Sequence, residues 1–308
     1  MNWGYTMFLH NDKEIFNDLI TLTANDTGLI KAIVEKDYYV TLFLKKISQI
    51  QPDIIFKGGT SLSKCYKIIN RFSEDIDLNV KFEDKVTQGR RKMLKAAVVQ
   101  AADEAGLKIT NLDETKSRRD FNKYEMEYST VYKSDFLKQN LICETAVFFK
   151  AYPVERLEAD SFIYRYLEKT DRLDIAREYG LTPFVLNVQS AERTLIDKLF
   201  ALGDYRLSGN IKGHSRHIYD IVCLMKIVAV DENLGILLNA VREERKLHKS
   251  CLSSQDGVNL PELLRKTVTD EDFINDYNKI TLPLLFEKLS YEEAISEFNK
   301  LLDSGVIK

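Results

Sequence analysis

The order of strand-like and helix-like segments along the chain predicts an α+β protein. Strand patterns are confined to residues before Ser190, and almost every later segment has helical periodicity. Runs of strands followed by runs of helices are typical of α+β folds or of separate domains. A chain of 308 residues also exceeds one typical hydrophobic core. We therefore expect a mixed β-sheet flanked by helices over residues 1–188 and a C-terminal helical bundle over residues 189–308.

The spacing of apolar residues predicts the individual elements. Asp26 or Thr27 is the expected cap of a long helix over 27–50. The other predicted elements are helices over 11–22 and 60–70, strands over 53–57 and 73–80, a helix over 88–105, strands over 107–112, 121–132, 140–149 and 184–188, and helices over 190–203, 214–229, 231–248, 260–267, 270–279 and 290–303. Residues 150–183 show no clear strand, and Gly203–Gly213 is the most loop-like stretch of the helical half.

The composition is that of a soluble globular protein, with 44% hydrophobic and 30% charged residues. No apolar run approaches the roughly 20 residues needed to cross a bilayer, and the N-terminus lacks the features of a secretory signal. We therefore expect a cytoplasmic protein with no membrane partner. The cysteines are far apart with no Cys-x-x-Cys, which fits a reducing compartment without structural zinc. They are Cys65, Cys143, Cys223 and Cys251.

The net charge of −3 gives the chain no general attraction to nucleic acid. Any contact with RNA or DNA must therefore come from local patches. Two basic clusters, Arg90-Arg91-Lys92 and Arg118-Arg119, are candidates for following an RNA backbone. Solvated helix and loop faces are the alternative interpretation of both clusters.

The most informative segment is IIFKGGTSLSKCYKIINRFSEDIDLNV, residues 54–80. If its end is a strand, alternation places four polar side chains on one face: Ser73, Asp75, Asp77 and Asn79. Two carboxylates one pleat apart repel each other unless a cation lies between them, and hard oxygen ligands suit Mg²⁺. The glycine pair after the preceding strand leaves backbone N–H groups open to a phosphate chain. The segment therefore predicts a metal-dependent nucleotide site; the alternative is a tight turn followed by solvent-facing aspartates.

The same segment resembles the signature of the nucleotidyltransferase superfamily typified by DNA polymerase β. That signature is a glycine pair after a strand, a short helix, and Asp-x-Asp on the next strand. The blocks KGGTSLSK at 57–64 and RFSEDIDL at 71–78 resemble more narrowly the AbiEii/AbiGii toxin family. The resemblance implies a polymerase-β-like domain in the first part of the chain.

The resemblance also implies the roles of the acidic residues. Asp75 and Asp77 are expected to hold Mg²⁺, two ions in all, together with a third carboxylate on an adjacent strand. Glu144, in the apolar stretch LICETAVFF at 141–149, is the best candidate for that third ligand. Glu125 and Glu127 on the preceding strand are its competitors, and a strand-end glutamate paired with a lysine or arginine is the other interpretation of Glu144.

Phosphate contacts are expected from the glycine turn and the helix after it. Gly58 and Gly59 are the first candidates. Second-rank candidates for contacts to the nucleotide are Lys57, Thr60, Ser61, Lys64 and Ser73. Ser73 is also, with Arg71, a candidate for orienting the acidic strand.

A second block, NVQSAERTLIDKLFAL at 187–202 followed by RHIYDI at 216–221, resembles later motifs of the same toxin family. The resemblance implies that Lys198 and Asp220 face the nucleotide, where a lysine would balance triphosphate charge. Asp220 would orient Lys198 or accept a proton. The alternatives are a solvated Lys198 and an Asp220 that pairs with Arg216 four positions earlier.

Together the motifs predict a Mg²⁺-dependent nucleotidyltransferase that moves NMP from an NTP to an acceptor and releases pyrophosphate. The resemblance implies a role in toxin–antitoxin and abortive-infection systems, the 3′ end of tRNA as acceptor, and a separately encoded antitoxin as partner. Two alternatives stay open. One is a protein AMP-transferase of the same fold, and the other is a non-catalytic module that binds a nucleotide or a partner.

Overall fold

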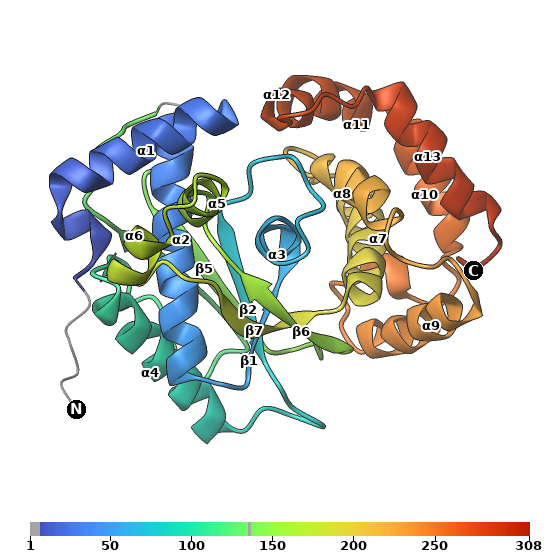
Figure 1. Ribbon diagram of the computed structural model, residues 1–308. Helices are drawn as coiled ribbons and strands as arrows, with labels where there is room; N and C mark the ends of the chain where they lie inside the picture. Colours follow the sequence, from blue (N-terminus) through green and yellow to red (C-terminus); the bar gives the residue numbers. More distant parts are fainter. Residues whose placement is uncertain (1–6, 135–136) are drawn as a thin grey trace. The chain divides into compact units, whose positions relative to one another are not determined.

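The computed structural model describes residues 7–134 and 137–308, and their contacts divide the chain into two compact units (Figure 1). Unit 1 comprises the described parts of Met1–Tyr66, Glu74–Lys150 and Glu155–Val188, and unit 2 comprises Lys67–Ser73, Ala151–Val154 and Gln189–Lys308. Two short segments from the first 188 residues thus group with the helical unit. One of them, Lys67–Ser73, carries Asn70, whose backbone N–H donates to the Tyr219 hydroxyl at 2.9 Å.

Unit 1 is built on a seven-stranded sheet with the order β3-β4-β5-β2-β1-β7-β6. The sheet is mixed, because β1 pairs antiparallel with β2 and parallel with β7, while β2 pairs parallel with β5. The strands are β1 (Ile54–Lys57), β2 (Asp75–Val80), β3 (Lys108–Ile109), β4 (Phe121–Glu127), β5 (Leu141–Ala146), β6 (Val154–Ala159) and β7 (Phe184–Gln189). The predicted α+β class with a mixed sheet is confirmed.

Helices accompany this sheet in the first unit. They are α1 (Lys13–Thr27), α2 (Lys31–Ile50), α3 (Gly58–Lys64), α4 (Gln88–Glu104), α5 (Phe162–Lys169) and α6 (Leu173–Glu178), preceded by a 3-10 turn at Leu9–Asn11. Helices α2 and α4 contact each other directly. One side of the acidic strand joins their hydrophobic core through Ile76 and Leu78, both fully buried. The polar side chains of that strand therefore alternate to the opposite face of the sheet.

Several predicted boundaries in unit 1 are wrong. Strand β6 lies within residues 150–183, where no clear strand was predicted. It was not predicted because its residues alternate only weakly between buried and exposed positions. The acidic strand begins at Asp75, so Ser73 precedes it. The helix before it ends at Lys64 rather than near residue 70. Helix α2 begins after Ile30, and Gly28 ends α1 in the left-handed conformation that glycine adopts without strain.

Unit 2 is helical from Ala191 onward. Its helices are α7 (Ala191–Ser208), α8 (Arg216–Leu224), α9 (Glu232–Lys246), α10 (Leu260–Val268), α11 (Glu271–Asp276), α12 (Leu282–Leu284) and α13 (Tyr291–Asp303), with a 3-10 turn at Leu252–Ser254 and a π-helical turn at Tyr277–Thr281. Ser190 caps α7 as expected, since its side chain accepts from the Arg193 N–H. No described helix has both the length and the apolar composition of a membrane-spanning segment.

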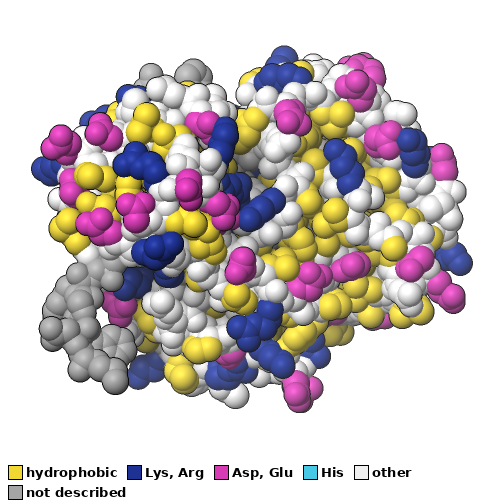
Figure 2. Space-filling model, in the orientation of Figure 1, with side chains coloured by type: hydrophobic (Ala, Val, Ile, Leu, Met, Phe, Trp, Pro, Cys, Tyr) yellow, Lys and Arg dark blue, Asp and Glu magenta, His cyan; other side chains and the backbone are white. Residues whose placement is uncertain are grey.

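Helix α7 continues through Gly203, in a region expected to be a loop. A Cβ atom there would lie 2.7 Å from Cβ of Ser253 and 3.0 Å from Cδ2 of Leu263. Because such distances are below normal contact, the glycine serves close packing inside the unit rather than a turn. Lys, Arg, Asp and Glu side chains are interspersed over the face shown in Figure 2.

Candidate active site

The glycine turn and the acidic strand meet at Gly58 and Asp77. Lys57, the last residue of β1, lies directly opposite Asp77 on β2. Gly58 has φ +77°, and a Cβ atom there would lie 2.0 Å from Oδ2 of Asp77. Any side chain at position 58 would therefore be strained and would collide with the carboxylate. The sequence pairs glycine with aspartate here because the backbone of one turn lies against the side chain of the next strand.

Of the three candidates for the third carboxylate, Glu144 lies directly opposite Asp77, on β5. Glu125 lies opposite Ile142 and Glu127 lies opposite Lys108, so neither faces an aspartate of β2 in the register. Burial raises the pKa of Glu144, and the charges of Asp77 and then Asp75 raise it further, while Lys123 and Lys57 oppose the shift. The three carboxylates therefore repel one another, and a cation would relieve that repulsion.

The donor set fits Mg²⁺ in chemistry, because it consists of carboxylate oxygens on adjacent strands. Within the described residues, no three His, Cys, Asp or Glu side chains are gathered tightly enough to form a metal site. Asp75 instead has Lys138 beside it, with Nζ 3.5 Å from Oδ1. That lysine is more than half exposed, and exposed pairs of this kind contribute only about 0–1 kcal/mol. A cation can therefore displace it at small cost.

The two hydroxyls after the glycine pair stabilise the turn itself. The Thr60 hydroxyl donates to the backbone carbonyl of Asp75 at 2.5 Å, which ties α3 to the start of β2. The Ser61 hydroxyl donates to the carbonyl of Gly58 at 2.8 Å. Both side chains are buried. Their observed contacts fix the relative position of the glycine turn and the acidic strand.

Lys64 is buried in an ion pair of its own. Its Nζ lies 2.6 Å from Oδ1 of Asp37 and donates to the Thr41 hydroxyl at 2.5 Å. The other oxygen of Asp37 accepts from the Phe162 N–H at 2.8 Å. Its ammonium is engaged in this way, and a contact of Lys64 with phosphate stays a prediction from the sequence. Its observed role is to join α3 to α2.

A second buried lysine, Lys36, lies next to the acidic strand. It is 1% exposed, donates to the carbonyl of Lys138 at 2.7 Å and pairs with Glu74. Lys36 was not predicted as a buried residue, because three consecutive charged residues at 35–37 have the pattern of a solvated face. The available signal was the apolar residues on both sides of these charges in the sequence, at 32–34 and 38–40; the structure buries this part of α2 on all sides. Lys36 thus fixes the residue that precedes Asp75.

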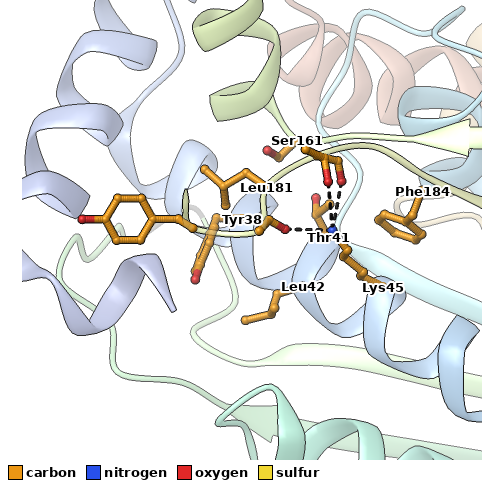
Figure 3. Close-up of a pocket in the computed structure, with 10 residues that line it drawn as sticks. Tyr38, Thr41, Leu42, Lys45, Ser161, Leu181 and Phe184 are labelled. Atoms are coloured by element: carbon orange, nitrogen blue, oxygen red, sulfur yellow. Dashed lines mark hydrogen bonds between the residues drawn. The ribbon is translucent and has the colours of Figure 1, made fainter. Parts of the chain in front are cut away.

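A hollow lined by α2 residues and the segment 179–184 is too small for a nucleotide (Figure 3). Its volume is about 20 Å³, room for roughly one water molecule. Lys45 reaches across it and donates to the carbonyls of Gly180 at 2.8 Å and Thr182 at 3.1 Å. The ring of Phe184 lies beside this ammonium, 5.9 Å from it. This hollow is a packing feature that ties the loop to α2.

Unit 2 holds the other predicted site residues in one buried cluster. Asp220 is fully buried, and its two oxygens accept from Nε and Nη2 of Arg71, each at 2.7 Å. Lys198 donates to the same carboxylate at 2.7 Å. Lys198 is itself 6% exposed, so the solvated alternative for Lys198 is wrong. Asp220 pairs with Arg71 and Lys198, and not with Arg216 four positions earlier in the helix.

The charges in this cluster fix the protonation state of Asp220. Burial by itself would raise the pKa of its carboxyl, but Arg71 and then Lys198 hold that pKa far below its usual range. Asp220 is therefore ionised at neutral pH and is no proton acceptor there. It can orient Lys198 instead. Burial lowers the pKa of Lys198, and Asp220 opposes this shift.

His217 completes the surroundings of Lys198. Its Nδ1 lies 3.3 Å from the Lys198 ammonium. Burial and then the positive charge of Lys198 hold the pKa of His217 well below its usual value, so the ring is neutral. Its nitrogen can then accept a hydrogen bond from the lysine. Sequence reasoning missed this contact, although His217 directly follows Arg216 in the motif.

A mixed sheet with two acidic residues on one strand and a glycine turn on its neighbour is the arrangement expected of a nucleotidyltransferase. The family described as "Nucleotidyl transferase AbiEii toxin, Type IV TA system" matches residues 42–303. The chain therefore belongs to this family and is a nucleotidyltransferase toxin of a type IV toxin–antitoxin system, as expected from its motifs. Membership implies an NTP substrate and a cognate antitoxin.

Among solved structures, MenT4, a nucleotidyltransferase toxin from Mycobacterium tuberculosis H37Rv, is similar to this chain at 15% sequence identity. The match covers 93% of this chain and 97% of that chain, with a TM-score of 0.49. At that score the likeness carries no weight of its own, and the assignment rests on the family match. A comparison with curated proteins found no match.

Proposed function

We propose that the protein transfers NMP from an NTP to the 3′ end of an RNA, with tRNA as the expected acceptor, in a Mg²⁺-dependent reaction. The observation that carries the proposal is the contact of Gly58 with Asp77, opposite Glu144. It places a bare backbone turn, suited to phosphates, beside carboxylates suited to a divalent cation. The acceptor comes from the family resemblance.

Asp75, Asp77 and Glu144 would hold the Mg²⁺, two ions in all. When bound, such ions polarise the α-phosphate and activate the attacking hydroxyl. The protein's own part is to hold the three carboxylates close together on β2 and β5. Burial raises the pKa of Glu144, and the charges of Asp77 and Asp75 raise it further.

Gly58 and Gly59 would accept the phosphate chain of the NTP against the turn. Asp77 lies where a side chain of residue 58 would be, so a phosphate would approach the turn through its backbone N–H groups instead. Thr60 supports this geometry through its bond to the Asp75 carbonyl. Ser73 stays a candidate for contact with the nucleotide on the strength of the family resemblance.

Lys198 would stabilise the charge that develops on the departing pyrophosphate. Such stabilisation dominates catalysis of phosphoryl and nucleotidyl transfer, because the transition state is loose. Asp220 and His217 would hold its ammonium in place through the bonds described above. Asp220 remains ionised throughout, so its role is positioning.

The deciding experiment is to incubate the protein with each NTP, Mg²⁺ and total tRNA and to sequence the RNA 3′ ends. The proposal predicts added nucleotides and released pyrophosphate with wild type and none with Asp77→Asn. The matched control is Glu127→Gln, which changes a carboxylate of the same sheet that faces Lys108 instead. If the RNA stays unextended and a protein instead gains the mass of an NMP, the acceptor is a protein and not RNA. Nucleotide binding without pyrophosphate release would refute catalysis.

A further inference from the structure

Four charged residues lie in one row across the sheet. In the strand register, Lys57 of β1 faces Asp77 of β2, Asp77 faces Glu144 of β5, and Glu144 faces Lys123 of β4. Directly paired residues share one face of a sheet. With strands about 4.8 Å apart, the row spans roughly 14 Å. Two of the three proposed metal-binding carboxylates, Asp77 and Glu144, thus have a lysine on either side.

The two ends of this row differ. At the β1 end, Lys57 runs directly into the turn at Gly58, which lies against Asp77. At the β4 end, the side chain of Lys123 is 45% exposed and its Nζ lies 3.1 Å from Glu125, itself 37% exposed. An exposed pair of that kind is weak and exchanges readily. Lys36 and Lys64, by contrast, are buried in fixed ion pairs.

The geometry of nucleotidyl transfer indicates that the acceptor binds near the β4 end of the row. The 3′ oxygen of the acceptor bonds to the α-phosphorus, the bond to the β-phosphate oxygen breaks, pyrophosphate leaves with the electron pair, and the hydroxyl proton passes to solvent. Attacking and leaving oxygens are in line on opposite sides of the phosphorus. With the β- and γ-phosphates beside Gly58, the acceptor approaches over β5 and β4.

We propose that Lys123 binds a backbone phosphate of a nucleic-acid acceptor next to its reacting 3′ hydroxyl. This inference rests on the proposed function and assigns a residue to the binding of its RNA acceptor. A nucleotide that ends in a 3′ hydroxyl carries a phosphate of its own close by, whereas a serine, threonine or tyrosine side chain carries none. An ammonium on the acceptor side of the carboxylates therefore suits a polynucleotide and has no partner on a protein acceptor.

The alternative is a purely structural role, in which Lys123 only neutralises Glu144. Opposite charges that face each other across strands stabilise a sheet by about 0.2–1 kcal/mol. That role would affect transfer to every acceptor alike and would leave RNA binding unchanged. A phosphate contact instead weakens RNA binding when it is removed. Without that contact, RNA binding also releases one counterion fewer, so the binding constant depends less on salt concentration.

The test measures equilibrium binding of a labelled single-stranded RNA with a free 3′ end, without NTP, over a range of salt concentrations. The variants are Lys123→Gln, Lys123→Arg and, as matched control, Lys108→Gln. Lys108 is an exposed lysine of the same sheet, on β3, outside the charged row. Thermal unfolding of each variant verifies that it is folded.

We expect Lys123→Gln to bind RNA roughly threefold or more weakly and to lower the slope of log K against log salt by about 0.7. Lys123→Arg and Lys108→Gln should behave as wild type. In the transfer assay, the KM for RNA should rise in Lys123→Gln while the KM for NTP stays unchanged.

An unchanged salt slope in Lys123→Gln, or a wild type that binds no RNA, would overturn the proposal. Because the binding assay needs no turnover, its result is independent of the proposed function. RNA extension with an unaffected Lys123→Gln would keep the function and reject the contact. A reduced slope without any RNA extension would keep the contact and reject the function.

Discussion

Two charge clusters, one around Asp77 in unit 1 and one around Asp220 in unit 2, differ in how their charges shift pKa values. In unit 1, burial and neighbouring carboxylates raise the pKa of Glu144. In unit 2, Arg71 and Lys198 overcome the effect of burial and hold the pKa of Asp220 far below normal. The Asp220 cluster is thus complete in itself. Asp75, Asp77 and Glu144 repel one another, and a cation would relieve that repulsion.

The largest expected effect is on activity. Asp77→Asn should lower nucleotide transfer by about a hundredfold to a thousandfold or more, the range seen when one electrostatic contact to a transition state is lost. Because asparagine has nearly the size of aspartate, the loss in activity should far exceed any loss in the free energy of unfolding. Enzyme assays and denaturant titrations on the same preparation check both statements. An active Asp77→Asn would place the chemistry elsewhere.

Asp220→Asn should show the reverse balance, with stability as the main loss. Removing one partner from a buried ion pair costs about 3–5 kcal/mol, measured as the free energy of unfolding in denaturant. Arg265→Gln is the control, because it breaks an exposed pair with Asp303 and should cost under about 1 kcal/mol. Equal losses in the two variants would contradict the contrast between the clusters.

The same ion pair predicts a pH dependence with a definite sign. The folded-state pKa of Asp220 lies below its ordinary value of 3.8. Its contribution to stability is therefore fully present above about pH 4 and declines as the pH falls below that value. The difference in unfolding free energy between wild type and Asp220→Asn should shrink on acidification. A difference that grows at low pH would refute the assignment.

Gly58→Ala tests the contact that defines the unit 1 site. The new Cβ would meet Oδ2 of Asp77, and the residue would keep a φ of +77°. We expect loss of transfer together with about 1–3 kcal/mol of destabilisation, from strain at a left-handed position. Gly257→Ala is the control, since it has φ +83° but nothing within contact distance. It should lose stability alone.

The smallest effect concerns proton competition at Glu144. Because its pKa is raised, protons should compete with Mg²⁺ at a pH above that of an ordinary glutamate, which weakens metal binding on the acid side. Titration calorimetry with Mg²⁺ at several pH values measures this dependence. Glu144→Gln should bind Mg²⁺ more weakly and with a flatter pH profile. An identical profile would remove Glu144 from the metal site.

Local sequence predicted that the glycine turn lies beside the acidic strand, because the two are neighbours in the chain; the catalytic and metal-binding roles of their residues stay predictions. The turn at Gly58 and the alternation around Asp77 are predicted from one short segment. Glu144 was chosen as a candidate because it is a single acidic residue in an apolar stretch. The partner of Asp220 was harder, since Arg71 lies 149 positions away. Periodicity shows which residues are buried, but packing alone decides which buried charges meet. Strand β6 was missed for a related reason, because its alternation is weak.

The most direct test of the central claim is a crystal structure with Mn²⁺ in place of Mg²⁺ and a non-hydrolysable NTP, with the metal located by its anomalous signal. The account predicts metal bound by Asp75 and Asp77, with the phosphates against the turn at Gly58. Metal and phosphates bound away from these residues, in a protein that still transfers nucleotides, would contradict it.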